Sequence, residues 1–316
     1  MEEISLEYPI FPLFSVIIPV YNGSNYLREA IDSVLSQTYS NIEIIVVNDG
    51  SIDNFDTRNI SISYGNKIRY FEKENGGVSS ALNFGISKML GKYFCWLSHD
   101  DFFPPDRIKS DYYTICNYKC DVVFTDIEVI DENYNVLYSS NWASIINSPY
   151  QLLRNECLHF CGITIKKELV IENNFFDLNN KSTQDVQMAL LISRKYDFIK
   201  NTKVKTKIRL HDINRIVHTR DNIFQRDDLF YLSKKIQSQI NVIEFSKHLT
   251  YNSDVDYIRS YINFADFFFF TKNKKYFNFY LIKAFKKSLR NIFKKEVQYL
   301  FLKSIKGLTY NSLKLK

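Results

Sequence analysis

The sequence predicts an α/β fold in which a mostly parallel sheet is flanked by helices and followed by a helical C-terminal extension. Within the 316 residues, short β-branched segments alternate with segments of helical periodicity through the first half of the chain. Seven of the nine glycines lie in the first 91 residues, mostly where turns are expected. Beyond Asp221 only helical periodicity is found. Strands that alternate with helices are typical of parallel sheets with helices on both faces.

The first half of the chain contributes strands and helices in regular order. Residues 15–20 (SVIIPV) are apolar and mostly β-branched, which indicates a strand buried on both faces. The next helix is expected over 24–37, where apolar residues recur at helical spacing and Ser24 is a candidate cap. Further strands are predicted at 42–47, 68–72 and 93–97, with a second helix at 77–89.

The second half continues the alternation less regularly. A strand at 122–126 is followed by an antiparallel excursion over 127–138 that turns around 131–133. The later predicted elements are a helix at 151–156, a strand at 160–165, helices at 166–172 and 183–195, and a basic strand at 203–210. Asp185 therefore comes at a helix N-terminus.

Polar residues follow three of these strands at the point where each strand ends. They occupy 19–23 after the first strand, 48–51 after the second and 98–101 after the fourth. Ligands of open α/β sheets bind outside the carboxyl ends of the strands, so we expect these segments to converge on one site. For Asp100 and Asp101 taken alone, solvated caps at a helix N-terminus are the alternative.

The Asp100-Asp101 pair indicates a divalent cation. Two neighbouring carboxylates repel each other unless a cation or good donors lie between them. Oxygen ligands suit Mg²⁺ or Mn²⁺, which commonly bind one or two carboxylates together with substrate phosphates. The chain has no GxGxxG after its first strand and no GxxxxGK[ST] anywhere, so a phosphorylated substrate would depend on the cation for charge neutralisation.

Taken in order, four segments resemble the family 2 glycosyltransferases of the GT-A fold. They are SVIIPVYNGSNYLREAIDSVLSQTYSNIEIIVVNDGS, ENGGVSSALNFGI, FCWLSHDDFFPPDRI and STQD. The resemblance covers about residues 13–215 and implies inverting transfer of a sugar from a UDP-sugar. It also implies a catalytic domain over 1–220, with a nucleotide-binding half at about 13–101 and an acceptor-binding half at about 102–220. The helical, basic region 221–316 forms the second part of the chain.

The resemblance implies roles for residues of the nucleotide half. Those expected around the nucleobase and ribose are Pro19, Tyr21, Asn22 and Asp49. Asp49 would accept a hydrogen bond from the base N3–H, which favours uracil. The other residues implied for the donor pocket are Gly76, Gly77, Ser80, His99 and Asp100.

Three further positions have roles or departures implied by the same resemblance. Asp101 would ligate the metal, as the last acid of a D-x-D-like motif that has Ser98 in place of its first acid. Asp185 matches the catalytic base, and His211 matches a histidine near the metal and diphosphate. From the residues alone, a helix N-cap is the alternative for Asp185, and an exposed or core histidine is the alternative for His211. Leu82 stands where an arginine is common in the family.

The net charge of +6 is unevenly distributed. From Thr271 onward the chain has 13 basic side chains and one acidic side chain, so 271–316 carries +12 and the remainder −6. Bulky apolar residues are interleaved with these lysines. We therefore expect 271–316 to contact an anionic membrane surface, and a helical subdomain packed on the catalytic body is the alternative. Nucleic acid is not an expected partner, because no reader motif is present.

The five cysteines and the N-terminal residues bear on the compartment. An odd number of cysteines indicates reduced thiols, and buried structural cysteines are favoured over a zinc site formed by Cys157, His159 and Cys161 with Cys116 and Cys120. The first 14 residues lack a basic start and a long apolar core, and no apolar run reaches the roughly 18 residues of a membrane span. We expect a cytoplasmic protein, peripheral on the inner face of the cell membrane.

The sequence therefore predicts an inverting glycosyltransferase that uses Mn²⁺ or Mg²⁺. The donor is a UDP-sugar carrying a hexosyl or N-acetylhexosaminyl group. The acceptor is a hydroxyl of a glycan or lipid-linked glycan of the capsule or lipopolysaccharide type. One alternative is a sugar nucleotidyltransferase, although Tyr21-Asn22-Gly23 is not the Gly- and Arg-rich loop expected after its first strand. A basic membrane-binding protein on an inactive transferase body is the other alternative.

Overall fold

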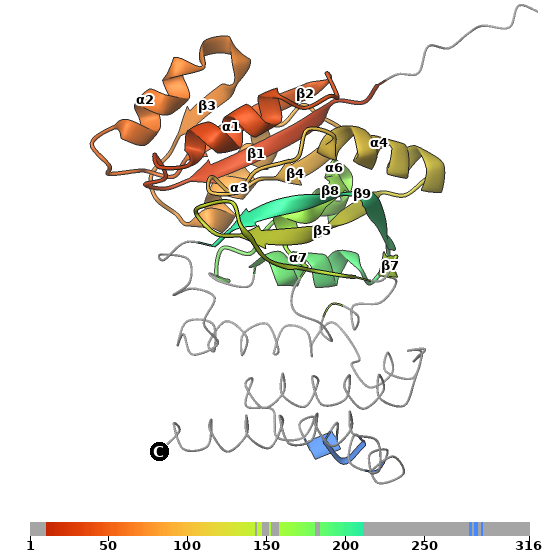
Figure 1. Ribbon diagram of the computed structural model, residues 1–316. Coiled ribbons are helices and arrows are strands. Elements are labelled where there is room, and N and C mark those ends of the chain that lie inside the picture. The colour runs from red at the N-terminus through yellow and green to blue at the C-terminus, as the bar shows by residue number, and fades with distance from the viewer. Residues whose placement is uncertain are drawn as a thin grey trace, which may run out of the picture. The chain divides into compact units, whose positions relative to one another are not determined.

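The structure is a computed structural model that describes residues 11–142, 144–146, 152, 158–180 and 184–210, together with 278–279, 281–283 and 286 (Figure 1). The described residues from 11 to 146 and from 158 to 210 belong to one compact unit. Leu152 and the described residues between 278 and 286 belong to a second. The first unit is an α/β structure built on one mixed sheet, and it contains the site.

One half of the sheet is parallel, as expected. Its strands are β1 (Phe14–Val20), β2 (Ile42–Asn48), β3 (Arg69–Glu72) and β4 (Tyr93–Trp96), in the order β3-β2-β1-β4. All seven residues of β1 are buried, which agrees with its continuous apolar sequence. In register, Val20 pairs with Asn48, so β1 and β2 end side by side. The loops that follow these strands consequently begin at one edge of the sheet.

The other half of the sheet is mixed. β8 (Ile163–Lys166) runs antiparallel to both β4 and β5 (Val122–Ile130), whereas β9 (Phe198–Arg209) is parallel to β5. The short strands β6 (Val136–Ser139) and β7 (Ile145–Ile146) add antiparallel pairs. The expected antiparallel excursion is the β5–β6 hairpin, in which the Asp131 carboxylate accepts hydrogen bonds from the backbone of Asn133 and Asn135.

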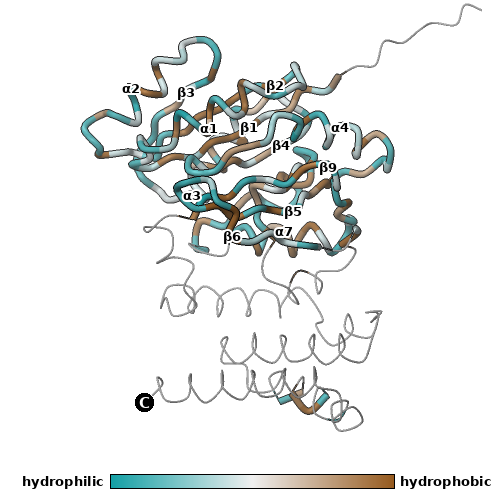
Figure 2. The backbone as a smooth tube through the Cα atoms, viewed as in Figure 1, coloured by the Kyte–Doolittle hydropathy of each residue, from teal (hydrophilic) through white to brown (hydrophobic). Residues whose placement is uncertain are grey.

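Helices cover both faces of the sheet. Alternate residues of β1, including Val16 and Ile18, pack with α1 (Leu27–Leu35) and α4 (Arg107–Tyr118). On the opposite face lies α3 (Val78–Lys88), where a side chain on Gly85 would collide with Ile17. Figure 2 shows hydrophobic residues along the central strands and polar residues on the outlying segments. The predicted α/β sheet flanked by helices is confirmed.

Some boundaries differ from those expected. The first helix begins at Leu27 with Tyr26 as its cap, because the amides of both residues donate to the Gly23 carbonyl in a turn that includes Ser24. The segment Phe160–Gly162 is a 3-10 turn, not the start of a strand. The helices α2 (Asp56–Ser63) and α4 were not predicted. The polar and β-branched sequence of α2, DTRNISIS, does not show a clear helical pattern. Its first turn is stabilised by the Asp53 carboxylate, which accepts hydrogen bonds from the amide and the hydroxyl of Thr57.

The last helices among the described residues of the first unit are α6 (Lys167–Glu172) and α7 (Gln184–Ile192). Several expectations lie outside the described residues: His211, the helical region from 221, and most of both the predicted helix at 151–156 and the basic segment 271–316. In the part of the chain that is described, no helix combines the length and the apolar content needed to cross a membrane.

Candidate functional site

The loops after β1 and β2 are joined at the sheet edge. The amide of Asn22 donates to the Ser51 hydroxyl at 2.9 Å, and the amide of Ile52 donates to the Asn22 side-chain oxygen at 2.7 Å. Asn22 has a left-handed φ of 50°, a conformation that asparagine tolerates better than most residues. Tyr21 is 45% exposed beside this junction, while Pro19 is buried in the strand. An aromatic ring is thereby presented to solvent at the sheet edge.

Asp49 fixes the loop that precedes α3. Its side chain is 4% exposed and its oxygens accept hydrogen bonds from the amides of Gly76 and Gly77, the shortest being 2.7 Å from Gly77. Lys73 forms an ion pair with the same carboxylate at 2.6 Å. Gly77 has φ +83°, which a side chain would strain, and a side chain on Gly76 would meet the Ser80 hydroxyl. The structure therefore groups Asp49, Gly76, Gly77 and Ser80.

His99 connects the loop after β4 with the loop after β1. A side-chain carbon built on Gly23 would lie 2.3 Å from the His99 ring, so glycine is required for the ring to pack there. The amide of Gly23 also donates to the Thr57 hydroxyl at 3.2 Å. His99 therefore lies against the loop that carries Tyr21 and Asn22.

Asp101 is a buried acid at the end of this loop. It is 3% exposed, and burial together with the neighbouring Asp100 carboxylate raises its pKa well above the usual value. Its carboxylate accepts a hydrogen bond from the backbone amide of Arg209, at 2.9 Å to Oδ1, and another from the Cys161 thiol. A buried carboxylate beside a second carboxylate is stabilised in its charged form by a cation. The donor chemistry and burial at Asp101 thus fit a divalent metal ion.

Arg209 clamps the same loop from β9. Its Nε donates to the carbonyl oxygen of Asp100 at 3.2 Å, and its Nη2 forms an ion pair with Glu29 at 2.5 Å. The guanidinium also lies over the rings of Tyr26 and Tyr134, 4.6 and 4.9 Å from the two centroids. A delocalised cation suits such stacking and remains charged when buried. Arg209 therefore fixes the backbone that carries both acids.

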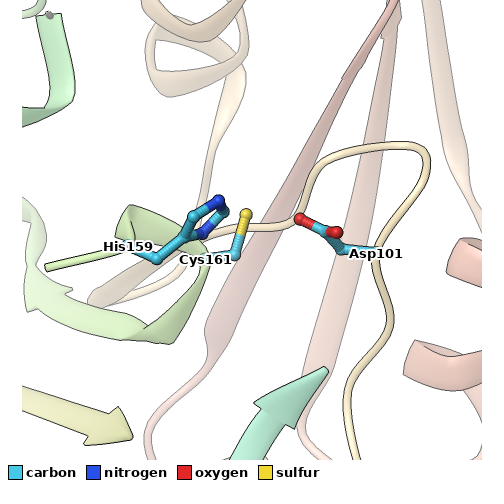
Figure 3. A group of neighbouring side chains, drawn as sticks. All are labelled: Asp101, His159 and Cys161. Atoms are coloured by element: carbon cyan, nitrogen blue, oxygen red, sulfur yellow. The ribbon is translucent and has the colours of Figure 1, made fainter. Parts of the chain in front are cut away.

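The turn before β8 brings Cys161 and His159 close to Asp101. The amide of Ser98 donates to Cys161 Sγ at 3.3 Å, and the Ser98 hydroxyl lies at the same distance from this sulfur. One ligand atom each of Asp101, His159 and Cys161 lies within 4.8 Å of the other two (Figure 3). Cys161 is buried, as predicted for a structural cysteine, while Cys116 is exposed and does not fit that prediction. The structure thus adds a thiol and an imidazole to the expected carboxylate site.

Asp185 lies in the first turn of α7, as predicted. Its Oδ1 accepts from the amide of Val186 at 2.8 Å, and burial raises its pKa to about 6. The chain just before α7 is tied to α3, because the Ser79 hydroxyl donates to the Asn180 carbonyl at 3.5 Å. A carboxylate with this raised pKa has the basicity that suits proton abstraction near neutral pH.

The structure brings most of the predicted residues together and adds others. Hydrogen bonds and close packing connect the loops after β1, β2 and β4. Asp185 lies on a separate helix, and His211 lies outside the described residues. Leu82, at the position where the family commonly has arginine, is fully buried. Sequence reasoning missed Lys73 and Arg209. Arg209 is 108 residues from Asp101, and no local pattern marks that pairing.

A comparison with protein families matches residues 15–166 to the model described as glycosyl transferase family 2. An uncharacterized glycosyltransferase of Rickettsia typhi is 39% identical over 269 residues, which cover 79% of this chain and 83% of that protein. A minor teichoic acid biosynthesis protein, GgaB of Bacillus subtilis, is 33% identical over 66% of this chain and 24% of its own length. The chain spans 30% and 34% of the length of two uncharacterized glycosyltransferases from Rickettsia bellii and Rickettsia felis, each 44% identical to it.

Solved structures of similar fold include S. aureus TarS 1-349 in complex with UDP-GlcNAc, with a TM-score of 0.57 and 16% identity over 88% of this chain and 91% of that one. Another is the mannosyltransferase PcManGT of Pyrobaculum calidifontis in complex with GDP-Man and Mn²⁺, with a TM-score of 0.55 and 16% identity over 90% and 88% of the two chains. These neighbours share the GT-A fold. The family match, the relatives and the fold agree, and the chain belongs to glycosyltransferase family 2.

Proposed function

We propose that this protein transfers a sugar from a nucleoside-diphosphate sugar, with UDP as the preferred nucleotide, to an acceptor hydroxyl with inversion. The observation that carries the proposal is the buried Asp101 at the edge where the loops after β1, β2 and β4 are joined by direct contacts. Family membership favours transfer over the nucleotidyltransferase alternative. The reaction breaks the bond between the sugar's anomeric carbon and the diphosphate oxygen, and forms a bond between the same carbon and the acceptor oxygen.

The nucleotide would occupy the half formed by about residues 13–101. Tyr21 is exposed where a ring can contact the nucleobase, and Asn22 is fixed beside it by Ser51 and Ile52. Asp49 already accepts from Lys73 and two glycine amides, so its main contribution is to hold the loop of Gly76 and Gly77 open to the donor. A uracil N3–H would share the remaining lone-pair capacity of this carboxylate.

Asp101 is the proposed ligand of a divalent cation, for which the sequence predicts Mn²⁺ or Mg²⁺. When bound, such an ion supplies Lewis-acid stabilisation of charge on the departing diphosphate. Asp100 lies beside it, and Arg209 contacts both residues: its amide donates to the Asp101 carboxylate and its guanidinium donates to the Asp100 carbonyl. His99 packs on Gly23, between this acidic end and the β1 loop, where it would contact the donor.

Asp185 is the proposed catalytic base, on the acceptor-binding half at about 102–220. Its carboxylate would take the proton of the acceptor hydroxyl while the oxygen attacks the anomeric carbon. Burial raises the pKa of this carboxyl to about 6, so it is ionised at neutral pH and more basic than an exposed aspartate. A single base opposite the leaving group gives direct displacement and hence inversion.

The acceptor is proposed to be a growing surface polymer or glycolipid of the capsule or lipopolysaccharide type. The similarity to GgaB, a protein of minor teichoic acid biosynthesis, supports a surface-polymer acceptor. The complex of the structural neighbour TarS with UDP-GlcNAc supports an N-acetylhexosaminyl donor, with a hexosyl donor as the other choice.

A panel of nucleotide sugars tests the proposal. Purified protein is incubated with UDP- and GDP-sugars, divalent cation and short polyol or lipid-linked glycan acceptors, and the products are analysed by mass spectrometry and NMR. We expect one UDP-sugar to give an inverted glycoside and free UDP. Release of pyrophosphate from a nucleoside triphosphate and sugar phosphate would instead identify a nucleotidyltransferase.

Peripheral membrane association through 271–316 is part of the proposal. The support is the charge of that segment, with 13 basic side chains and one acidic side chain. Co-sedimentation with anionic vesicles should decrease steeply as the salt concentration rises, because each surface cation contributes about 1 kcal/mol of screened attraction. Equal co-sedimentation with neutral and anionic vesicles would reject the association.

A further inference from the structure

Asp101, His159 and Cys161 form a cluster whose members come from two loops. Asp101 follows β4, and the other two lie in the turn before β8. A carboxylate oxygen, an imidazole nitrogen and Sγ all lie within 4.8 Å of one another. Figure 3 shows the sulfur between the imidazole ring and the carboxylate in this view. Asp101 is 3% exposed, Cys161 is fully buried and His159 is half-buried, so the two anionic members of the cluster are shielded from bulk water.

The backbone and its neighbours aim these side chains at one another. The amide of Gly162 donates to the His159 carbonyl at 2.9 Å, which closes the turn that carries His159 and Cys161. Ser98 contacts Sγ through its amide and hydroxyl, and the Arg209 amide donates to Asp101. Outer partners of this kind orient metal ligands and tune them.

The donor set is mixed, with one oxygen, one nitrogen and one sulfur ligand. Mg²⁺ takes oxygen ligands, whereas Zn²⁺ and Co²⁺ accept imidazole and thiolate as well. Three protein ligands that leave a fourth position open are typical of catalytic zinc sites. When metal–ligand bonds are about 2.0–2.3 Å long, the ligand atoms around a tetrahedral ion lie roughly 3.5 Å apart. The three ligand atoms here lie within 4.8 Å of one another, so side-chain movements of about 1 Å would bring them to bonding distance of one ion.

We propose that Asp101, His159 and Cys161 together bind one borderline divalent ion, Zn²⁺ or Co²⁺, in preference to Mg²⁺. The ion binds to a carboxylate, a neutral imidazole and a thiolate, and the thiol proton is released to solvent. The two anionic ligands balance the charge of the ion in this buried position. The inference rests on the proposed function in one respect, that Asp101 is the cation ligand, and it changes which cation is chosen.

Cobalt spectroscopy of the full-length, metal-stripped protein tests this inference without reference to activity. Co²⁺ is titrated anaerobically in a non-thiol reductant while the near-ultraviolet and visible spectra are recorded. We expect one equivalent of Co²⁺ to give a thiolate-to-cobalt charge-transfer band with visible ligand-field bands. Zn²⁺ should abolish these bands, and excess Mg²⁺ should not.

Variants assign the band to the cluster. Cys161→Ser should eliminate the charge-transfer band, and His159→Ala should weaken Co²⁺ binding at least about tenfold, the lower range seen for loss of an outer partner. Cys95→Ser is the matched control, because Cys95 is also buried but contacts Thr164 at 3.2 Å. This control should retain the band, and circular dichroism establishes that each variant is folded.

Absence of the band from the wild-type protein would overturn the inference, whether or not the variants fold. Retention of the band in folded Cys161→Ser would overturn it as well. Binding of UDP with Mn²⁺ is measured on the wild-type protein and on Asp101→Asn. If UDP binding requires Asp101 while no thiolate band forms, the mixed-ligand site is wrong and the proposed function stands. If the band forms and no nucleotide binds, the metal site stands and the proposed function fails.

Discussion

At the scale of single residues, the site depends on carboxylates whose surroundings differ. Asp49 accepts hydrogen bonds from two amides and an ion pair from Lys73, so its charge is satisfied by the protein. Asp101 is buried with a raised pKa, which favours a cation as its partner. Burial raises the pKa of Asp185 to about 6, and no charged neighbour contributes to this shift. These environments suggest three roles: a scaffold, a metal ligand and a base.

Substitution of Asp185 by asparagine tests the assignment of the base. Asp185→Asn retains the shape of the side chain but cannot accept a proton, so we expect turnover to fall by about 10²–10⁴. Affinity for UDP should stay within about twofold, because the nucleotide half is unchanged. Steady-state kinetics and calorimetry measure the two quantities. Turnover close to that of the wild type would exclude Asp185 as the base.

The same carboxyl predicts how activity and stability depend on pH. With a pKa of about 6 the base is protonated in more acidic solution, so kcat/KM should fall about tenfold per unit below pH 6. The pKa of this carboxyl is lower in the unfolded state, so the folded state binds the proton more tightly. The folded state therefore loses stability as the pH rises through about 6. Asp185→Asn should therefore raise Tm more at about pH 8 than at about pH 5. A flat rate profile down to about pH 5, with UDP binding intact, would contradict this account.

The sequence marks single residues where the signal is local. Asp49 and Asp101 follow predicted strands, whereas Gly76 and Gly77 were implied by the family resemblance, and the roles of all four stay predictions. Arg209 is not marked, because it reaches the site through a contact with Asp101, 108 residues away in the chain. His159 was noted only in the disfavoured zinc alternative with the cysteines, and no local pattern pairs it with Asp101. Cys161 is buried, as predicted for a structural cysteine, and no local sequence pattern pairs it with Asp101.

At the scale of elements, Arg209 at the end of β9 positions the loop that contains Asp100 and Asp101, here called the acidic loop. Arg209→Lys retains a positive charge but loses the stacking on Tyr26 and the planar fork that also reaches Glu29. We expect metal affinity to weaken about 10- to 100-fold, as for other outer partners, with a smaller effect on kcat at saturating metal. Metal titrations of activity separate these quantities.

A matched control is available on β3. Arg69→Lys changes an arginine that pairs with Glu43 at 2.5 Å, away from the acidic loop, and should leave metal affinity unchanged. Equal effects of the two substitutions would show that Arg209 contributes only general stability.

The contact of α4 with β8 and β9 is stabilised by a buried ion pair. Arg107 and Asp111 are both fully buried and paired, and Asp111 also accepts from Thr164 at 2.5 Å and from Asn201 at 2.7 Å. Asp111→Ala should lower the free energy of unfolding by about 3–5 kcal/mol, because it leaves a buried guanidinium without its partner.

The double variant Arg107→Met/Asp111→Leu distinguishes lost charge pairing from lost packing. It should cost less than the sum of the two single changes, since no buried charge is left unpaired. The partly exposed pair Lys166 and Asp121 is the control, and Asp121→Ala should change the free energy of unfolding by no more than about 1 kcal/mol. Denaturant titrations measure all of these values, and additive effects at Arg107 and Asp111 would contradict the pairing.

At the scale of the whole molecule, the fold class was predictable because each central strand is one uninterrupted apolar segment of the sequence. The strands β1, β2 and β4 are short apolar segments buried on both faces, and their sequence requires a covered sheet. The mixed half was less predictable, because antiparallel pairing of β8 with both β4 and β5 depends on long-range contacts. The weakly patterned helix α2 was missed for the same reason, since tertiary contacts outweigh its propensity.

Cation-dependent binding of UDP tests the central claim most directly. Calorimetry of the full-length protein with UDP is carried out with Mn²⁺ or Co²⁺, and again in the presence of a chelator. We predict binding that requires the cation and is weakened about 100-fold or more in Asp101→Asn, because a direct ligand should matter at least as much as an outer partner. Unchanged UDP affinity in the chelator, or in folded Asp101→Asn, would contradict a metal-dependent nucleotide-sugar site at this edge of the sheet.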